Sequence, residues 1–273
     1  MIRFTKMQGA GNDYIYIDNR DGAISDPAEL SKKISDRHFG AGSDGLVLIC
    51  KSDKADARMR MFNPDGSESE MCGNASRCVS RFVWERWFGK GKDSMTLETG
   101  AGIKPISIHS ENGKFVCSTV DMGAPILEPA KIPVKGSSNR ISIDGTEFTC
   151  VSMGNPHAVT FVPDVNTAPV LTKGPGFEVA DNFPRKANIE FVQIIDRAHV
   201  KMRVWERGTG ETLACGTGAC ATGVACVLNG KTDRKVELQL LGGKLVIEWR
   251  ESDNHVLMTG PAEFVFEGEW PAK

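Results

Sequence analysis

Two Cys-Gly pairs, Cys72-Gly73 and Cys215-Gly216, are the residues whose type and setting best suit chemistry. Each pair stands where a helix is predicted to begin, about 74–88 for the first and about 216–228 for the second. A helix N-terminus offers free backbone N–H groups and a positive dipole end, which bind carboxylates and lower the pKa of a cysteine. The glycine leaves those N–H groups open to a ligand. The sequence therefore predicts two reactive thiols, each beside an anion-binding helix start.

The two cysteines also mark an internal repeat. One constant separation of 143 positions relates five pairs of matching residues without a gap: Gly11-Asn12 and Gly154-Asn155, Met59-Arg60 and Met202-Arg203, Glu68 and Glu211, Cys72-Gly73 and Cys215-Gly216, Gly100 and Gly243. A constant separation over most of the chain is not expected by chance. We infer two similar halves, with a boundary near the Pro- and Gly-rich stretch from Pro125 to Pro133.

Packed about an approximate twofold axis, such halves would bring the two thiols to opposite sides of one ligand. A base on one face of a carbon and an acid on the other are the groups needed to invert that carbon by proton transfer. The alternative is that both cysteines are small buried residues and the glycines only cap helices. The matched placement favours the reactive pair. The other six cysteines have no counterpart in the repeat and are expected to be small hydrophobic residues: Cys50, Cys78, Cys117, Cys150, Cys220 and Cys226.

The remainder of the chain is rich in strand-like runs and poor in helices. Seven runs of β-branched or aromatic residues predict strands, at 14–17, 46–49, 106–108, 114–116, 158–161, 189–192 and 245–248. Only one further helix is expected, over about 27–37. This composition of elements indicates an α+β protein.

Composition narrows the kind of partner. The 33 basic and 35 acidic side chains leave a net charge of -2 and no long basic run, which favours a small ligand over nucleic acid. The first residues do not resemble a signal peptide and no window of about 18 apolar residues is present, so a cytoplasmic protein that does not enter a membrane is expected. Eight cysteines without a Cys-x-x-Cys pair fit neither a disulfide scaffold nor a structural zinc site.

Polar residues near strand ends and turns are candidates for ligand binding. Four asparagines can hydrogen-bond a zwitterionic ligand, although any of them can equally be a turn former: Asn12, Asn63, Asn155 and Asn188. Glu206-Arg207 precedes Cys215 and suits an ammonium and a carboxylate, or forms a surface ion pair. His157 follows a turn and is either structural or part of the site.

These motifs resemble the diaminopimelate epimerase family over nearly the whole chain. The resemblance is carried by six segments: Gly9-Ala10-Gly11-Asn12-Asp13, Arg37-His38-Phe39-Gly40-Ala41-Gly42-Ser43-Asp44-Gly45, Met61-Phe62-Asn63-Pro64-Asp65-Gly66-Ser67, Glu70-Met71-Cys72-Gly73-Asn74, Gly154-Asn155-Pro156-His157, and the stretch from Glu206-Arg207 through Thr212-Leu213-Ala214-Cys215-Gly216-Thr217-Gly218. It departs from the family at Ala75, where a glycine is usual, and at Asp44-Gly45, so we put little weight on Asp44 as a ligand contact.

The resemblance implies a fold and an activity. The fold would be two similar domains related by pseudo-twofold symmetry, each a curved, mostly antiparallel sheet around a central helix. We expect the domains at residues 1–125 and 126–262, with 263–273 returning to the first and the active site in the cleft between them. The activity would be interconversion of L,L- and meso-2,6-diaminopimelate on the route to lysine and peptidoglycan, without pyridoxal phosphate or a metal. The enzyme would be cytoplasmic, with a homodimer as the expected assembly.

The resemblance also assigns roles to residues. Cys72 and Cys215 would be the acid/base pair, and His157 and Glu206 would tune the thiols. The implied substrate-binding residues are Asn12, Asn63, Gly73, Asn74, Asn155, Asn188, Glu206, Arg207, Gly216 and Thr217. Two alternatives stay open: another two-cysteine racemase, of the proline or hydroxyproline type, and a non-catalytic amino-acid binding protein.

Overall fold

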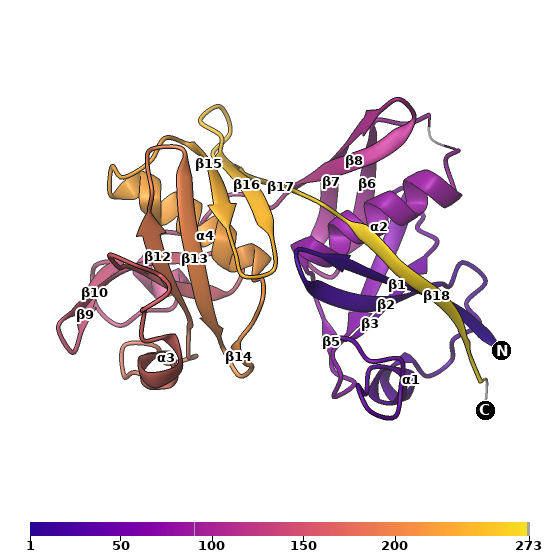
Figure 1. The fold of residues 1–273 in the computed structure, drawn as a ribbon, viewed down its shortest axis with the longest axis horizontal. Coiled ribbons are helices and arrows are strands. Elements are labelled where there is room, and N and C mark those ends of the chain that lie inside the picture. The colour runs from indigo at the N-terminus through magenta and orange to yellow at the C-terminus, as the bar shows by residue number, and fades with distance from the viewer. Residues whose placement is uncertain (90, 272–273) are drawn as a thin grey trace. The chain divides into compact units, whose positions relative to one another are not determined.

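The computed structural model describes residues 1–89 and 91–271 of the chain. They form two compact units, which are described separately (Figure 1). Unit 1 comprises Met1–Val120 together with the C-terminal segment that begins at Thr259, and unit 2 is Asp121–Met258. No helix among the described residues is both long and apolar enough to cross a membrane.

Unit 1 is built on a mixed, mostly antiparallel sheet. Its strands are β1 (Ile2–Gly9), β2 (Asn12–Asp18), β3 (Leu46–Cys50), β4 (Ala57–Phe62), β5 (Glu68–Ser69), β6 (Ser94–Thr99), β7 (Gly102–Glu111), β8 (Lys114–Asp121) and β18 (Glu263–Trp270). The pairs β1–β18, β1–β2, β3–β4, β4–β5, β6–β7 and β7–β8 are antiparallel, and β2–β3 and β4–β6 are parallel. In Figure 1 the yellow β18 runs beside the indigo β1, so the C-terminal strand completes the unit in which the chain begins.

Helix α2 (Gly73–Arg86) is the central element of unit 1. It packs against β1, β2, β4, β6 and β7, and its residues from Gly73 to Ser80 are all buried. A helix buried on several sides must be surrounded by sheet, and the strands of unit 1 accordingly lie around α2 in Figure 1. The shorter α1 (Pro27–Ile34) packs on β3 and β4, and begins where the Asp26 carboxylate accepts the Glu29 N–H at 3.0 Å.

Unit 2 has the same kind of sheet around its own helix. Its strands are β9 (Arg140–Ile143), β10 (Thr146–Ser152), β11 (Pro156–Phe161), β12 (Asn188–Ile194), β13 (His199–Glu206), β14 (Gly210–Glu211), β15 (Lys235–Gln239), β16 (Lys244–Trp249) and β17 (Val256–Gly260). The pairs β9–β10, β10–β11, β12–β13, β13–β14 and β15–β16 are antiparallel, and β11–β12 and β13–β15 are parallel. Helix α4 (Gly216–Leu228) packs against β10, β11, β12, β15 and β16.

The two units therefore share one topology, and the internal repeat is confirmed. The series β1, β2, β3, β4, β5, α2, β6 and β7 has the same order and the same parallel or antiparallel pairing as β10, β11, β12, β13, β14, α4, β15 and β16. The register of β2–β3 repeats in β11–β12, because Tyr16 pairs with Val47 in unit 1 and Val159 pairs with Glu190 in unit 2, each 143 positions later. The β10–β11 hairpin is shifted by one residue relative to β1–β2. The predicted α+β fold and all seven predicted strands are present.

One helix was missed by the sequence analysis. Helix α3 (Val170–Glu178) contains Gly174-Pro175-Gly176, three residues that disfavour a helix interior, so the local pattern predicts a loop. Packing outweighs this preference. Val170 and Phe177 lie in the core of unit 2, and an added Cβ on Gly174 would come within 2.8 Å of the Trp205 side chain. The remaining described helix is a 3-10 turn at Pro129–Lys131.

Candidate active site

Cys72 stands at the N-cap of α2, as predicted, and its side chain makes no capping hydrogen bond. The backbone is extended at Cys72 (φ -136°, ψ 123°) and turns helical at Gly73. Its thiol is partly exposed and donates to Asn12 Oδ1 at 3.4 Å. Asn74 Nδ2 donates to the same oxygen at 3.4 Å, and the buried Oδ1 of Asn74 has no partner among the described residues. The structure thus brings Cys72, Asn12 and Asn74 together.

A tight turn positions Asn12. Gly9 pairs with Asn12 across the β1–β2 hairpin, which leaves only Ala10 and Gly11 in the loop. Both have positive φ, 57° and 87°, as a two-residue hairpin turn with the twist of its strands requires. Asn12 therefore begins β2 at a fixed place beside the start of α2.

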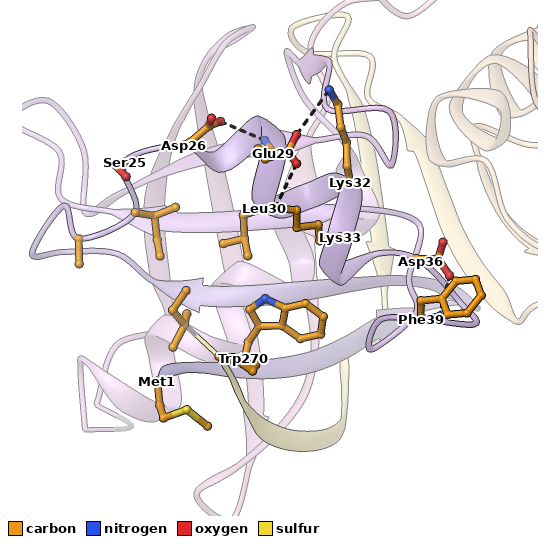
Figure 2. Close-up of a pocket in the computed structure, with 14 residues that line it drawn as sticks. Met1, Ser25, Asp26, Glu29, Leu30, Lys32, Lys33, Asp36, Phe39 and Trp270 are labelled. Carbon is orange, nitrogen blue, oxygen red and sulfur yellow. Dashed lines mark hydrogen bonds and ion pairs between the residues drawn. The ribbon is translucent and has the colours of Figure 1, made fainter. Parts of the chain in front are cut away.

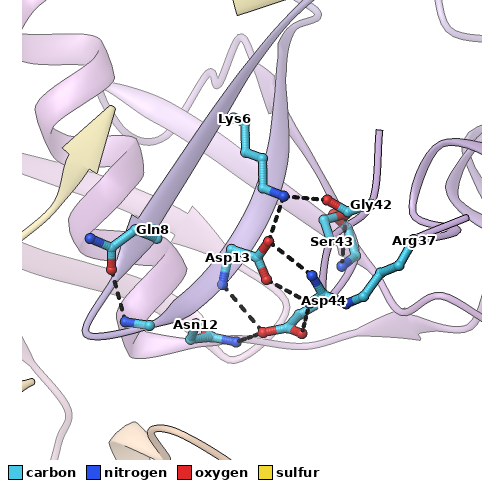
Figure 3. A network of polar contacts seen from close by, with 10 residues as sticks. Lys6, Gln8, Asn12, Asp13, Arg37, Gly42, Ser43 and Asp44 are labelled. Carbon is cyan, nitrogen blue, oxygen red and sulfur yellow. Dashed lines mark hydrogen bonds and ion pairs between the residues drawn. The ribbon is translucent and has the colours of Figure 1, made fainter. Parts of the chain in front are cut away.

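A polar network holds the other end of the Asn12 side chain (Figure 3). Asp44 Oδ2 accepts from Asn12 Nδ2 at 2.8 Å, while Arg37 bridges Asp44 and Asp13 at 2.8 Å to each. Burial alone would raise the pKa of Asp13, but the hydrogen bonds from Arg37 and Lys6 outweigh it and the pKa is lowered. Because a carboxylate only accepts hydrogen bonds, the amide nitrogen of Asn12 faces Asp44 and its oxygen faces Cys72.

Cys215 occupies the matching N-cap position of α4, again without a side-chain capping bond. Its environment differs from that of Cys72. The thiol is buried and lies 3.6 Å from Thr217 Oγ1. Burial raises the pKa of the Cys215 thiol well above its usual value, and the Glu206 and Glu190 carboxylates add to the shift. The backbone N–H of Gly218 at the helix start acts to lower this pKa, as expected, but desolvation and the two negative charges outweigh it, so the net shift is upward.

His157 is buried in unit 2 between two partners. Its Nδ1 lies 2.6 Å from Glu190 Oε1 and its Nε2 lies 3.1 Å from Asn155 Oδ1. Both His157 and Glu190 have side chains with no exposed surface. Burial raises the pKa of Glu190, while the charge and hydrogen bond of His157 act in the opposite direction. The sequence placed His157 on a turn; the structure places it in β11.

Glu206, Arg207 and Asn188 lie together at the ends of β13 and β12. Asn188 accepts from the Arg207 N–H at 2.9 Å and donates to the Pro156 carbonyl at 2.8 Å, so its amide is engaged within the protein. The Glu206 carboxylate accepts from the Thr212 hydroxyl. The Arg207 side chain is exposed. Among the described residues its only hydrogen bond is the one that it donates to the backbone carbonyl of Arg185, at 3.1 Å.

The other predicted ligand groups divide between the units. Asn63 is half-buried in the β4–β5 turn, where its side chain donates to Ser67 Oγ at 2.9 Å. The backbone donors of Gly73 and Asn74 stand in the first turn of α2, and those of Gly216 and Thr217 in the first turn of α4. Each unit thus supplies a thiol and a helix start, and in unit 1 an asparagine lies beside the thiol.

The remaining cysteines are reduced, as are Cys72 and Cys215. Cys78, Cys150, Cys220 and Cys226 are buried, as expected, whereas Cys50 and Cys117 are partly exposed. A pocket in unit 1 is lined by Met1, Leu30, Phe39 and Trp270, with charged α1 side chains at its rim (Figure 2). None of the predicted site residues contributes to that pocket.

Sequence reasoning missed Glu190 and undervalued Asp44. The strand pattern places Glu190 within the run Ile189-Glu190-Phe191-Val192 and assigns it no role. The signal that could identify it is the single carboxylate in a strand buried on both faces, where a charged residue is unusual. Asp44 is not itself shown to meet a ligand, but it fixes the amide that faces Cys72.

The arrangement is suited to acid/base chemistry on a carboxylate-bearing molecule. Each thiol lies beside free N–H groups of a helix start, which stabilise negative charge. Among the described residues no group of three or more His, Cys, Asp or Glu side chains is placed to hold a metal ion.

Two solved structures share the fold of this chain. A phenazine biosynthesis protein from Bacillus anthracis matches with a TM-score of 0.74 at 21% identity, covering 99% of both chains. A probable proline racemase from Agrobacterium radiobacter matches with a TM-score of 0.72 at 14% identity, covering 100% of this chain and 94% of the other. At such identities the likeness establishes the fold alone, which this chain shares with both structures.

Sequence comparison goes further and identifies the family. The model of the diaminopimelate epimerase family matches residues 4–128 and 149–265. Diaminopimelate epimerases from Acetivibrio thermocellus and Methanococcus maripaludis are each 56% identical to the chain over 275 residues, which cover 98% of this chain and 98% and 99% of theirs. The chain belongs to the diaminopimelate epimerase family, and it is an isomerase.

Proposed function

We propose that the protein interconverts L,L- and meso-2,6-diaminopimelate by moving the α-proton between two thiols, without a cofactor. The observation that carries the proposal is the repeated placement of Cys72 and Cys215 at uncapped helix starts in two units of one topology. The names of the relatives supply the substrate.

In the proposed mechanism the two thiols act on opposite faces of the substrate's α-carbon. One cysteine, as thiolate, removes the α-proton, and the opposite cysteine, as thiol, returns a proton to the other face. The proton is weakly acidic because it lies next to a carboxylate. The first-turn N–H groups of α2 and α4 would stabilise the charge that develops on that carboxylate during proton removal.

Diaminopimelate carries a second amino-acid head group, and the surroundings of Cys215 offer partners for it. The exposed guanidinium of Arg207 suits the distal carboxylate, and the Glu206 carboxylate suits the distal ammonium. The proposed substrate-binding side chains also include Asn63, Asn155 and Asn188. Proline and hydroxyproline have no second head group, so these charged side chains favour diaminopimelate over the alternative racemase substrates.

Purified protein incubated with single isomers tests this assignment. Chiral chromatography should detect meso product from L,L-diaminopimelate, and the reverse, with no added pyridoxal phosphate and with chelator present. L-Proline and trans-4-hydroxy-L-proline should remain unchanged. Conversion of either proline compound with no action on diaminopimelate would contradict the proposal, and binding without conversion would favour a binding protein.

Two expectations belong with this proposal. Because the proposed reaction belongs to a route to lysine and peptidoglycan precursors, we expect the enzyme to be cytoplasmic, and we expect the chain to form a homodimer. Light scattering on the protein as it elutes from a size-exclusion column measures its mass and so tests whether it is a homodimer.

A further inference from the structure

Glu190 is a buried carboxylate in the middle of strand β12. Its neighbours on the strand, Ile189 and Phe191, are buried, and its Oε2 has no hydrogen-bond partner among the described residues. Its Oε1 lies 2.6 Å from His157 Nδ1. Burying a carboxylate with one unpaired oxygen is costly, so stability does not explain the residue.

Unit 1 shows that the fold does not need a carboxylate at this position. The register partner of Val159 in β12 is Glu190, and the corresponding pair in unit 1 is Tyr16 and Val47. Val47 is fully buried. The same topology therefore accepts an apolar β-branched residue where unit 2 carries Glu190.

Glu190 lies next to Cys215 as well as His157. Gly218, in the first turn of α4, separates them: an added Cβ there would lie 2.7 Å from Glu190 Oε1 and 3.2 Å from Cys215 Sγ. A side chain at 218 would displace one or the other. The absence of a side chain at 218 thus lets the carboxylate approach the helix start that carries the thiol.

The hydrogen bonds around His157 determine where its protons lie. Nε2 faces Asn155 Oδ1, and with the Asn155 amide in this orientation Nε2 is the donor and carries a proton. One further proton lies between Nδ1 and Glu190 Oε1, whether the pair is written as imidazolium and carboxylate or as imidazole and carboxylic acid. Both forms are neutral overall. Losing that proton would leave a net charge buried beside Glu206, Cys150 and Cys215, the other titratable groups that interact with Glu190.

We propose that Glu190 is a positioning residue, which acts through His157 to fix the orientation of the Asn155 side chain. His157 Nε2–H occupies the Asn155 oxygen, so the Asn155 NH2 group is presented as a donor for an anionic group of the ligand. Among the described residues no acceptor pairs with that NH2 group. The inference rests on the proposed function for the identity of the ligand, a diaminopimelate carboxylate.

The two units then present opposite ends of equivalent asparagines. Asn12 is held through its nitrogen by Asp44 and turns its oxygen to Cys72. Asn155, at the equivalent position in the repeat, is held through its oxygen by His157. The Glu190–His157 pair gives unit 2 a hydrogen-bond donor where unit 1 has an acceptor.

Two substitutions separate this role from a merely structural one. Glu190→Gln keeps an amide that can donate to Nδ1, so Nε2 stays protonated and Asn155 stays oriented. Glu190→Val places the residue of unit 1 in unit 2 and leaves Nδ1 without a partner. Glu211→Gln, which removes a carboxylate paired with Arg203 in the same unit, is the control for loss of charge.

The first measurement is nitrogen NMR of the full chain labelled with 15N-histidine, with the His157 signals assigned by a His157→Gln variant. Nε2 should carry a proton in the wild type and in Glu190→Gln. In Glu190→Val, where Nδ1 has lost its partner, the signals of both ring nitrogens should shift. An unprotonated Nε2 in the wild type, or an unchanged spectrum in Glu190→Val, would overturn the inference.

The second measurement is steady-state kinetics with diaminopimelate. Glu190→Val should raise KM about tenfold or more, as expected when a donor to a charged ligand group is lost, while Glu190→Gln and Glu211→Gln stay within about threefold. Equal KM values in all variants would contradict the role. If the wild type does not act on diaminopimelate, the proposed function fails, and the imidazole spectrum still decides whether Glu190 sets the protons of His157.

Discussion

At the residue scale the two cysteines are alike in position and different in surroundings. Cys72 is partly exposed and meets a neutral amide oxygen, whereas Cys215 is buried near two carboxylates. The sequence was sufficient to find both thiols, because a Cys-Gly pair before a helix is a local pattern. It was not sufficient to give the pKa of Cys215, because the Glu190 and Glu206 carboxylates are brought to Cys215 by tertiary structure.

A first prediction concerns the reactivity of Cys215. Since its pKa is raised, alkylation by iodoacetamide should still accelerate with pH above the ordinary thiol value of about 9. Glu206→Gln removes a nearby negative charge and should lower the pKa, so alkylation at pH 8 should become several-fold faster. Mass spectrometry of the Cys215 peptide measures the rate, with Cys50 in unit 1 as an internal control. A rate that is unchanged or slower in Glu206→Gln would contradict this electrostatic account.

At the element scale helices α2 and α4 begin in the same way, with Cys at the N-cap and Gly as the first helical residue, but they differ at one position in the first turn. Position 75 of α2 is Ala, and the equivalent position of α4 is Gly218. Ala75 is fully buried without conflict, while Gly218 lies against Glu190 and Cys215. The sequence predicted both helices from periodicity, but missed α3, because its Gly174-Pro175-Gly176 run becomes helical only through packing against Trp205.

A second prediction exchanges these two residues. Gly218→Ala should lower kcat/KM by more than tenfold and destabilise the protein by about 1–3 kcal/mol, because its Cβ must displace Glu190 or Cys215. Ala75→Gly should cost only about 0.5–1 kcal/mol, the usual penalty of glycine within a helix, and leave activity within a few-fold of wild type. Urea unfolding and steady-state kinetics measure both. Equal losses of activity in the two variants would show that the Gly218 contact has no special role.

At the scale of the whole molecule the chain is one topology used twice. A constant separation of 143 positions was enough to predict this, because it relates matched residues from residue 11 to residue 243, and the strand register is kept in the central pairs β2–β3 and β3–β4 of unit 1 and their equivalents β11–β12 and β12–β13. The fold was predictable from the sequence to that extent. The buried pair of His157 and Glu190 was not, since its counterparts in unit 1, Tyr14 and Val47, carry no charge and so leave no trace in the repeat.

A third prediction follows from the proposed meeting of the two thiols at one site. Mild oxidation should join Cys72 and Cys215 in a disulfide and abolish activity, and reductant should restore it. Peptide mapping without reduction identifies the pair. Full activity after oxidant treatment, with the thiols shown to be accessible by alkylation, would argue against facing cysteines.

The most direct test of the two-thiol account is proton exchange in heavy water. L,L-Diaminopimelate incubated in D2O with wild-type protein should give meso product carrying deuterium at the inverted α-carbon, because the returned proton comes from a thiol in exchange with solvent. Cys72→Ala and Cys215→Ala should each abolish the inversion while keeping the wild-type circular dichroism spectrum. Product formed without deuterium, or inversion at the wild-type rate by either single variant, would contradict the account.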